Sequence, residues 1–356
     1  MTERPLILII GGGLLGLASA RACLDRGANI IVAERKTQTG HGAGFANSGM
    51  IHPSQSWPWM TQNLSSDAQT TAAQNVALLA KNSRRLLESR MKELGLSDLN
   101  RVKGCNKIFN SAEARERAKR RYIKIDIQAE NTDCLNHPAL YFPDDFSGSA
   151  LAWSQAETKA LVKDGAQIQT GVHVRLEKKQ GRLKAYLNGT HQTADHIILC
   201  AGHQTGTLLT SLGLNLPITP VRGFALDFDL SSIESNYLPQ MPVMDAASHS
   251  ALTCFGSRLR LSGTLNEDSA RPLWQRWYEI MPSFMSRLGR PIQVWSGNRP
   301  ISGLGRPIIA QSPIKGLWVN CGHGHMGWTL SMGSGALMAD IIMTGTSASN
   351  FGWPKT

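Results

Sequence analysis

Four residues near the beginning of the chain have the types and the spacing to hold a dinucleotide. Gly11, Gly13 and Gly16 form the pattern G-x-G-x-x-G, and Glu34 follows at the end of an apolar stretch. Glycines at this spacing permit a tight turn, close approach of the backbone to a pyrophosphate, and close packing of a helix on a strand. A carboxylate at the position of Glu34 accepts ribose hydroxyls, which favours a dinucleotide without a 2′-phosphate.

The elements that must position these residues are recognisable in the surrounding sequence. Leu6–Ile10 is a short apolar run typical of a strand buried on both faces, and Ile30–Ala33 is a second one. Between them, apolar residues recur at helical spacing up to Gly27, a typical helix terminator. A glycine-rich turn without a nucleotide is the alternative. The complete β–α–β context favours a dinucleotide, because the helix would offer its free N–H groups to the phosphates.

Composition bounds the class of protein. At 356 residues the chain is long for one hydrophobic core, which predicts two lobes. We expect no signal peptide and no spanning helix, because the N-terminal apolar run is short and leads into the glycine turn. The six cysteines are scattered without a C-x-x-C pair. This pattern predicts reduced thiols, no metal site and a cytoplasmic location.

The formal net charge is +11, and basic residues are densest in one part of the chain. We define the basic face as Lys81, Arg84, Arg85, Arg90, Lys92, Arg115, Arg117, Lys119, Arg120, Arg121 and Lys124. A solvated surface, a contact with anionic lipid and a contact with nucleic acid are three interpretations. Nucleic acid is disfavoured, because no zinc, recognition-helix or RNA-binding signature is present.

A second lobe is predicted from segments outside the dinucleotide unit. Pro217–Phe228 and Thr253–Gly263 are typical of antiparallel strands. Asp67–Leu94 is amphipathic at helical period, and we expect its apolar stripe to be buried in the core, namely Leu78, Leu79, Leu86, Leu87 and Met91. Leu273–Leu288 is predicted to be a helix broken at Pro282. Tyr141–Gly148 (YFPDDFSG) is predicted to be a loop or a hairpin, since it is rich in turn residues.

Three segments of the chain carry a resemblance to a known family. Thr39–Pro53 (TGHGAGFANSGMIHP) has little side chain to pack and suits backbone lying against a flat cofactor. Gly297–Pro307 contains G-x-R-P, and Val319–Asp340 contains G-H-G-x-x-G-W followed by G-S-G. With these segments the chain resembles the D-amino acid oxidase superfamily of FAD enzymes. It is most similar to bacterial D-amino acid dehydrogenases and their glycine oxidase relatives.

The resemblance implies an α/β fold with two domains. A discontinuous Rossmann-like FAD-binding domain would comprise residues 1–60, 140–215 and 297–345. An antiparallel-sheet substrate domain of α+β type would comprise residues 61–139 and 216–296, and residues 346–356 would form a C-terminal tail. The FAD is expected to be non-covalent, because neither His41 nor His52 clearly matches a position at which relatives attach flavin covalently.

The resemblance also assigns cofactor contacts. The expected FAD-binding residues are Gly11, Gly13, Leu14, Leu15, Gly16, Glu34, Arg35, Ala43, Asn47, Ser48, Gly49, Met50, Val172, Ala201, Gly202, Gly322, His323, Gly324, Met326, Gly327, Trp328 and Thr329. Val172 would contact the adenine through its backbone, with His173 as the alternative. The turn 322–327 would present a helix N-terminus, whose dipole can stabilise negative charge on the reduced flavin.

Two residues are assigned to catalysis and substrate binding. In the family, the arginine at the position of Arg299 holds the substrate carboxylate, and a guanidinium offers a planar fork for that task. An interdomain ion pair is the alternative for this arginine. His325 departs from the family, which carries a small residue there, and it would meet the substrate or tune the flavin. An ordinary histidine titrates near neutral pH, so its charge is expected to shape the pH dependence; a structural histidine bonded to backbone is the alternative.

The function implied is FAD-dependent oxidative deamination of a small amino acid, either a D-amino acid or a glycine-like amine. A neutral amine beside a Cα–H would give hydride to the flavin, and the resulting imine would hydrolyse without a dedicated general base. Electrons would pass to a quinone or another carrier. We also predict that the basic face of the protein contacts the inner surface of an anionic membrane.

Several alternatives remain open at this stage. One is an oxygen-using enzyme of the glycine or sarcosine oxidase type, and another is an RNA-linked, tRNA-modifying flavoenzyme. A third is a subunit of a larger amine-oxidising complex, so an oligomer is one expectation. The chain is shorter than typical D-amino acid dehydrogenases and nearer to glycine oxidases in size, which leaves the substrate open.

Overall fold

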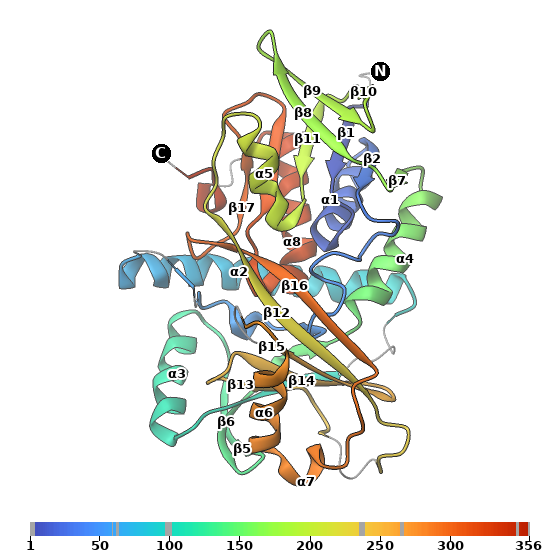
Figure 1. Cartoon of the computed structure of the whole chain (residues 1–356). Helices are drawn as coiled ribbons and strands as arrows, with labels where there is room; N and C mark the ends of the chain where they lie inside the picture. The colour runs from blue at the N-terminus through green and yellow to red at the C-terminus, as the bar shows by residue number, and fades with distance from the viewer. Residues whose placement is uncertain are drawn as a thin grey trace.

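Two large sheets organise the chain, as Figure 1 shows for the computed structural model. The structure describes residues 4–58, 60–61, 64–96, 102–234, 239–263, 267–346 and 349–354. The six-stranded sheet lies in the upper half of the view, and most of the nine-stranded sheet lies in the lower half. The predicted class, a mixed α/β fold with a second, largely antiparallel sheet, is confirmed.

The six-stranded sheet contains the predicted dinucleotide unit. Its strand order is β17 (Ile308–Gln311), β18 (Leu317–Cys321), β11 (His196–Leu199), β1 (Leu6–Ile10), β2 (Asn29–Glu34) and β7 (Gln167–Thr170). All neighbours pair in parallel except β17, which is antiparallel to β18 at the edge. The interior residues of β1 are fully buried, as its continuous apolar run predicts. The accompanying helices are α1 (Leu14–Asp25), α4 (Ala150–Lys163), α5 (Thr205–Thr210) and α8 (Gly327–Thr344).

The nine-stranded sheet forms the second lobe. Its strand order is β16 (Gln293–Ser302), β12 (Ile218–Asp229), β15 (Arg258–Gly263), β14 (Ser250–Phe255), β13 (Val243–Asp245), β4 (Val102–Ile108), β6 (His137–Ser147) and β3 (Met50–Ile51), with β5 (Glu130–Cys134) paired to β6. A separate three-stranded sheet consists of β8 (Val174–Lys179), β9 (Arg182–Leu187) and β10 (Thr190–Gln192). The remaining helices are α2 (Ser66–Glu93), α3 (Ala112–Lys124), α6 (Arg271–Ile280) and α7 (Pro282–Met285), with short 3₁₀ turns at Pro53–Gln55, Gly202–Gln204, Gly324–Met326 and Ser349–Phe351.

The prediction of a loop or hairpin for Tyr141–Gly148 was wrong, because all of this segment up to Ser147 belongs to strand β6. The register of β4 against β6 shifts between Lys103 and Cys105, which pair with Phe146 and Phe142. The irregularity places Pro143, Asp144 and Asp145 opposite the single residue Gly104 of β4. A strand can therefore contain these turn-forming residues. One of them, Asp145, is buried, and its carboxylate accepts hydrogen bonds from the Ser54 hydroxyl and N–H. Burial raises the pKa of this carboxyl to about 7.

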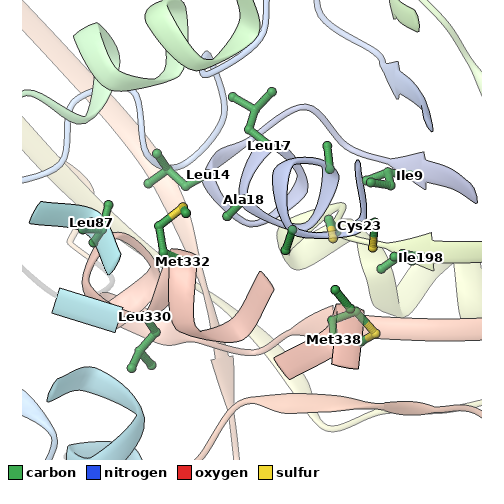
Figure 2. Close-up of a cluster of buried hydrophobic side chains, with 14 of the residues drawn as sticks. Ile9, Leu14, Leu17, Ala18, Cys23, Leu87, Ile198, Leu330, Met332 and Met338 are labelled. Atoms are coloured by element: carbon green, nitrogen blue, oxygen red, sulfur yellow. The ribbon is translucent and has the colours of Figure 1, made fainter. Parts of the chain in front are cut away.

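Helix α8 is held between α1 and α2 by two glycines of its G-S-G sequence. A Cβ at Gly335 would lie 2.6 Å from the backbone of Ala18 on α1, and one at Gly333 would lie 2.8 Å from Ser83 on α2. The Ser83 hydroxyl also accepts a hydrogen bond of 2.9 Å from the Gly333 N–H. Figure 2 shows the hydrophobic cluster that surrounds this junction, with side chains from β1, α1, α2, β11 and α8.

The predicted domain boundaries remain a proposal. Two of them, at residues 140 and 297, fall within β6 and β16, which are both strands of the nine-stranded sheet. Helix α2, assigned to the substrate domain, packs on α8 of the FAD-binding domain. In the expected tail, Phe351 is buried and the Gly352 carbonyl accepts a hydrogen bond from Arg306. Within the part of the chain that the structure describes, no helix is long and apolar enough to cross a membrane.

Candidate active site

A cavity of about 680 Å³ lies where the two sheets meet. One wall is made by the carboxyl ends of β1, β2, β11 and β18, which is where open parallel sheets place their ligands. The opposite wall is a face of the nine-stranded sheet, and the N-terminus of α8 closes one side. Glu34 lies among the lining residues of the first wall, and Arg299 and Lys107 lie in the second.

The glycine turn has the geometry of a phosphate cradle. Gly11 has φ +109°, and a Cβ there would lie 2.5 Å from the Cys200 carbonyl oxygen. A Cβ at Gly16 would lie 1.8 Å from the Gly11 carbonyl oxygen, so neither position accepts another residue. Gly13 is the N-cap of α1 and provides no side-chain cap, which leaves the first N–H groups of the helix for phosphate oxygens. These residues fit the pyrophosphate of FAD.

The Glu34 carboxylate lies at the position predicted for a ribose contact. One of its oxygens accepts a 2.7 Å hydrogen bond from the Gly12 N–H, and the other accepts one of 2.7 Å from the Lys36 N–H. The Val172 N–H donates to the carbonyl oxygen of Glu34 at 2.9 Å, so Val172 lines the cavity beside this carboxylate. His173 also lines the cavity, but its backbone N–H and carbonyl are both bonded to Asn188. Val172 therefore remains our proposed adenine contact.

The small-residue segment after β2 turns along the cavity. The Asn47 side-chain oxygen accepts a hydrogen bond from the Gly49 N–H, and the Asn47 carbonyl accepts one from Arg260 on β15. Gly49 has φ +72°, and a Cβ there would collide with the Phe255 ring at 2.3 Å. The segment is therefore fastened to the second sheet, and most of its residues that line the cavity are small, although His41, Met50 and His52 line it too.

Most of the predicted FAD-binding residues line the cavity. Those that do are Gly11, Gly13, Leu14, Leu15, Glu34, Arg35, Ala43, Asn47, Ser48, Met50, Val172, Ala201, Gly202, His323, Gly324, Gly327 and Trp328. Five others lie behind its wall, namely Gly16, Gly49, Gly322, Met326 and Thr329. The Thr329 hydroxyl is bonded to the N–H and to Nδ1 of His52, and so it fixes the segment that enters the cavity.

The turn before α8 brings a helix N-terminus to the cavity, as predicted. Gly327 and Trp328 begin the helix, both line the cavity, and the N-cap residue provides no side-chain cap. His323 is buried, and its Nε2 lies 2.8 Å from the Ser334 hydroxyl. Burial lowers its pKa to about 3, so this imidazole is neutral and does not cancel the dipole of the helix. The helix end can therefore stabilise an anion.

Arg299 and His325 are brought together by strand β16. An isolated bridge joins Ile301 of this strand to His323, so the turn lies against the strand that carries Arg299. The guanidinium occupies space that Gly223 of β12 leaves open, since a Cβ there would lie 2.0 Å from Nη1. Its Nη2 donates a 3.4 Å hydrogen bond to the Gly263 carbonyl, and burial lowers its pKa to about 10.

The His325 imidazole is neutral at physiological pH. Nε2 lies 3.1 Å from the Gln55 carbonyl oxygen, so Nε2 carries the hydrogen and donates it. Burial is the main cause that holds its pKa well below the ordinary value, and His52, Arg299 and Lys107 lower it further. This opposes the expectation that His325 titrates near neutral pH. The backbone bond of the structural alternative is present, yet the ring also lines the cavity.

Among the cavity residues that the sequence did not predict, three bear on the site around Arg299. Gly223 makes room for Arg299, Trp295 packs its ring over Gly297, and Lys107 contributes a second cation. Only Gly223 had a recognisable signal, because an isolated glycine inside a strand pattern marks a close approach. Lys107 lies on a strand that is distant in sequence from Arg299. Trp295 lies on the same strand as Arg299 but carries no pattern of its own.

Comparisons with known proteins agree with this geometry. The family model described as FAD dependent oxidoreductase matches residues 7–341. The D-amino acid dehydrogenase of Methylobacterium nodulans is 27% identical in an alignment of 402 positions, gaps included. This alignment covers 94% of this chain and 94% of that protein. The D-amino acid dehydrogenase of Vibrio cholerae is 24% identical and covers 96% of both.

Two solved structures have the same fold. Glycine oxidase from Geobacillus kaustophilus has a TM-score of 0.81 and 22% identity, covering 100% of both chains. Iminodiacetate oxidase from Chelativorans sp. BNC1 has a TM-score of 0.79 and 20% identity, covering 97% of this chain and 98% of the other. Since the family model spans nearly all of a chain whose cavity fits the cofactor, the protein belongs to the family of FAD-dependent oxidoreductases and is an oxidoreductase that uses FAD.

Proposed function

We propose that the protein oxidises a small amino acid at its Cα–N bond. The observation that carries this proposal is the Arg299 guanidinium, which faces the same cavity as the N-terminus of α8 and the glycine cradle. When bound, FAD supplies the acceptor for the hydride that leaves Cα. The substrate becomes an imine, which water hydrolyses. A primary amino acid then gives a keto acid and ammonia. An N-substituted amino acid gives an amine together with a keto acid or an aldehyde.

Arg299 would bind the substrate carboxylate and so orient Cα. Its planar fork matches a carboxylate with two parallel hydrogen bonds, and the low exposure of the site strengthens them. Gly223 fixes the place of the guanidinium, because only a residue without a side chain leaves that space open. A carboxylate held at two points leaves few orientations for the neighbouring Cα–H.

The charges of the site favour a neutral amine. Arg299 and Lys107 both line the cavity, and positive charge disfavours the ammonium form of a bound substrate. Hydride transfer needs the nitrogen lone pair, so this bias helps the reaction. His325 is neutral, and its Nε2 donates to the Gln55 carbonyl, so its ring adds no positive charge beside the amine.

The proposal is tested by turnover of a substrate panel. The panel holds glycine, D- and L-amino acids, N-substituted glycines, and amines that lack a carboxylate. Reduction of a soluble artificial electron acceptor and hydrogen peroxide formed in air are measured in parallel. We expect turnover only with substrates that carry a carboxylate beside the amine. Equal turnover of amines without a carboxylate would contradict the role of Arg299. Peroxide equal to the substrate consumed would identify an oxidase.

As a part of the same proposal, electrons pass to a quinone or another carrier at an anionic membrane. The supporting feature is a surface formed by α2 and α3, where Leu78 is 70% exposed and Ile123 is 69% exposed. The two helices adjoin here, since Gln74 donates to the Lys124 carbonyl and Lys81 pairs with Asp126. Leu78 was expected to be part of the buried stripe of its helix. Exposed apolar side chains among basic residues suit an anionic bilayer.

Co-sedimentation with lipid vesicles tests this contact. We expect the protein to bind vesicles that contain phosphatidylglycerol and not vesicles of phosphatidylcholine alone. The double variant Leu78→Ser with Ile123→Ser should bind more weakly. Val162→Ser removes an apolar side chain that is 54% exposed on α4, and it should bind like the native protein. Equal binding of all variants would refute this surface as the contact.

A further inference from the structure

Two cationic side chains reach the substrate end of the cavity, although the proposed reaction needs only one. Arg299 lies on β16, at one edge of the nine-stranded sheet, and Lys107 lies on β4, several strands away in the same sheet. We propose that Lys107 is a second anion-binding residue, and that the preferred substrates carry a second carboxylate besides the one bound by Arg299. This inference rests on the proposed function, because it names the substrate class of the same site.

The sheet register places Lys107 on the face that lines the cavity. Lys107 is the direct partner of Met244 on β13, which pairs with Ala251 on β14, which pairs with Ser262 on β15. Directly paired residues project from the same face of a sheet. All four residues line the cavity, so Lys107 projects from the sheet face that forms the second wall of the cavity.

The spacing of the two cations suits a small molecule with two acidic groups. The Arg299 guanidinium reaches the Gly263 carbonyl at the end of β15, and three strand intervals separate β15 from β4. At about 4.8 Å each, these intervals separate the two backbones by roughly 14 Å. This figure already includes the reach of Arg299, so the Lys107 side chain and a bound ligand share the remaining distance. His325 lies within electrostatic range of both cations, since each of them lowers the pKa of its imidazole after the larger effects of burial and His52.

The hydrogen-bond partners of Lys107 are neutral. Its Nζ donates to the Gln55 side-chain oxygen at 3.0 Å and to the Tyr122 hydroxyl at 3.2 Å, and an ammonium carries a third N–H. Among the described residues, no carboxylate lies within 4.0 Å of Nζ. Asp245 lines the same cavity, but it is held by Arg276 through two hydrogen bonds of 2.7 and 3.1 Å. A substrate carboxylate would supply the missing negative charge.

A purely structural role for Lys107 is the competing explanation. Lys107 holds the Gln55 side chain, and the Gln55 carbonyl accepts the hydrogen bond from His325. A lysine with only this task would affect all ligands alike. A lysine that binds a second carboxylate would affect only ligands that carry one. Matched pairs of ligands therefore separate the two roles.

The first experiment measures binding to the FAD-loaded enzyme. Succinate and butyrate differ only by a carboxylate in place of a methyl group, and each is titrated while the visible absorption of the flavin is recorded. We expect succinate to bind about ten-fold more tightly than butyrate, as one charge-assisted hydrogen bond provides. Lys107→Gln should abolish this preference. Lys103→Gln, the same change on the same strand outside the cavity, should retain it. Equal binding of both acids to the native enzyme would overturn the inference, and so would an unchanged preference in Lys107→Gln.

The second experiment compares kcat/KM for substrate pairs. Aspartate is compared with 2-aminobutyrate in both enantiomers, and N-carboxymethylglycine is compared with N-ethylglycine. We expect a preference for one dicarboxylic member, which shows whether the second acid lies on carbon or on nitrogen, and loss of the preference in Lys107→Gln. An equal loss for both members of each pair would assign Lys107 to structure. If no amino acid is oxidised while the succinate preference persists, the proposed function fails and the second anion site stands.

Discussion

Arg299 and His325 lie in the same cavity, but the structure gives them different electrostatic characters. Arg299 keeps its charge, because a pKa of about 10 still leaves a guanidinium protonated near neutral pH. His325 has lost its charge, because burial and neighbouring cations hold its pKa well below the ordinary value. We therefore assign carboxylate binding to Arg299 and uncharged hydrogen bonding to His325.

Arg299→Met should leave FAD bound and weaken amino acid substrates severely. Losing a charge-assisted pair in a desolvated site costs about 2–5 kcal/mol, on the order of 30-fold to several thousand-fold in kcat/KM. Arg299→Lys should recover only part of this loss, since lysine lacks the fork. Gly223→Ala should also raise KM, because its Cβ would displace the guanidinium without removing the charge. Unchanged steady-state kinetics in Arg299→Met would assign the arginine to structure.

The neutral His325 predicts a specific pH dependence. Burial, as the main cause, holds its pKa well below the ordinary value in the folded protein, so we expect no titration step of this imidazole near neutral pH. The rate of flavin reduction, measured by rapid mixing, should then depend on pH in the same way for native protein and for His325→Ala, although the rates themselves differ. A titration step near pH 6.5 in the native profile that disappears in the variant would show that the histidine is charged in the working enzyme.

At the scale of elements, the position of α8 decides where the helix N-terminus meets the cavity. The two glycines of its G-S-G sequence let it approach α1 and α2 at the distance of backbone contact. Figure 2 shows Ala18 of α1, Leu87 of α2 and Met332 of α8 in the hydrophobic cluster where these helices meet. Any displacement of α8 would carry the turn 322–327 with it.

Gly335→Ala should destabilise the protein and weaken its hold on FAD. The new Cβ would lie 2.6 Å from the backbone of Ala18, which cannot move aside without shifting α1. We expect a loss of about 1–3 kcal/mol in unfolding free energy, seen as a lower melting temperature. Gly206→Ala is the matched control, since this helical glycine has no atom within 4 Å of the new Cβ. It should be neutral or slightly stabilising, and equal melting temperatures for both variants would contradict the packing described.

Elements with a strong local pattern were predictable, and those shaped by tertiary contacts were not. β1, α1 and β2 follow from an apolar run, a helical period and a glycine turn, and all three lie where they were predicted. β6 was missed because its turn-forming residues are absorbed by an irregular pairing with β4. Leu78 fits the apolar stripe of α2 by spacing, yet it faces outward beside α3.

The site shows the same division. The glycine cradle and Glu34 are local in sequence, so their spacing alone predicts a dinucleotide. The roles of Gly223 and Lys107 depend on which strands become neighbours in the nine-stranded sheet, and no local pattern encodes that order. The neutral state of His325 depends on the burial created by Gln55 and His52, which join it from a distant part of the chain.

At the scale of the whole molecule, the two sheets together line one cavity, which we propose holds both the cofactor and the substrate. The FAD should be bound without a covalent link. The two histidines of the small-residue segment have other contacts, because His52 is bonded to Thr329 and the His41 ring packs on Phe45 at 4.7 Å. Acid precipitation of the yellow protein should therefore release the flavin into the supernatant. Flavin that stays in the pellet would show a covalent attachment that the account does not contain.

We propose above all that this molecule oxidises amino acids through FAD held between its two sheets. Anaerobic mixing of the purified yellow protein with single amino acids, followed by its visible absorption, tests this claim most directly. We predict that at least one amino acid with a free carboxylate bleaches the flavin, and that the same amino acid at the same concentration leaves Arg299→Met far less reduced. A flavin that dithionite bleaches but no amino acid does would contradict the account.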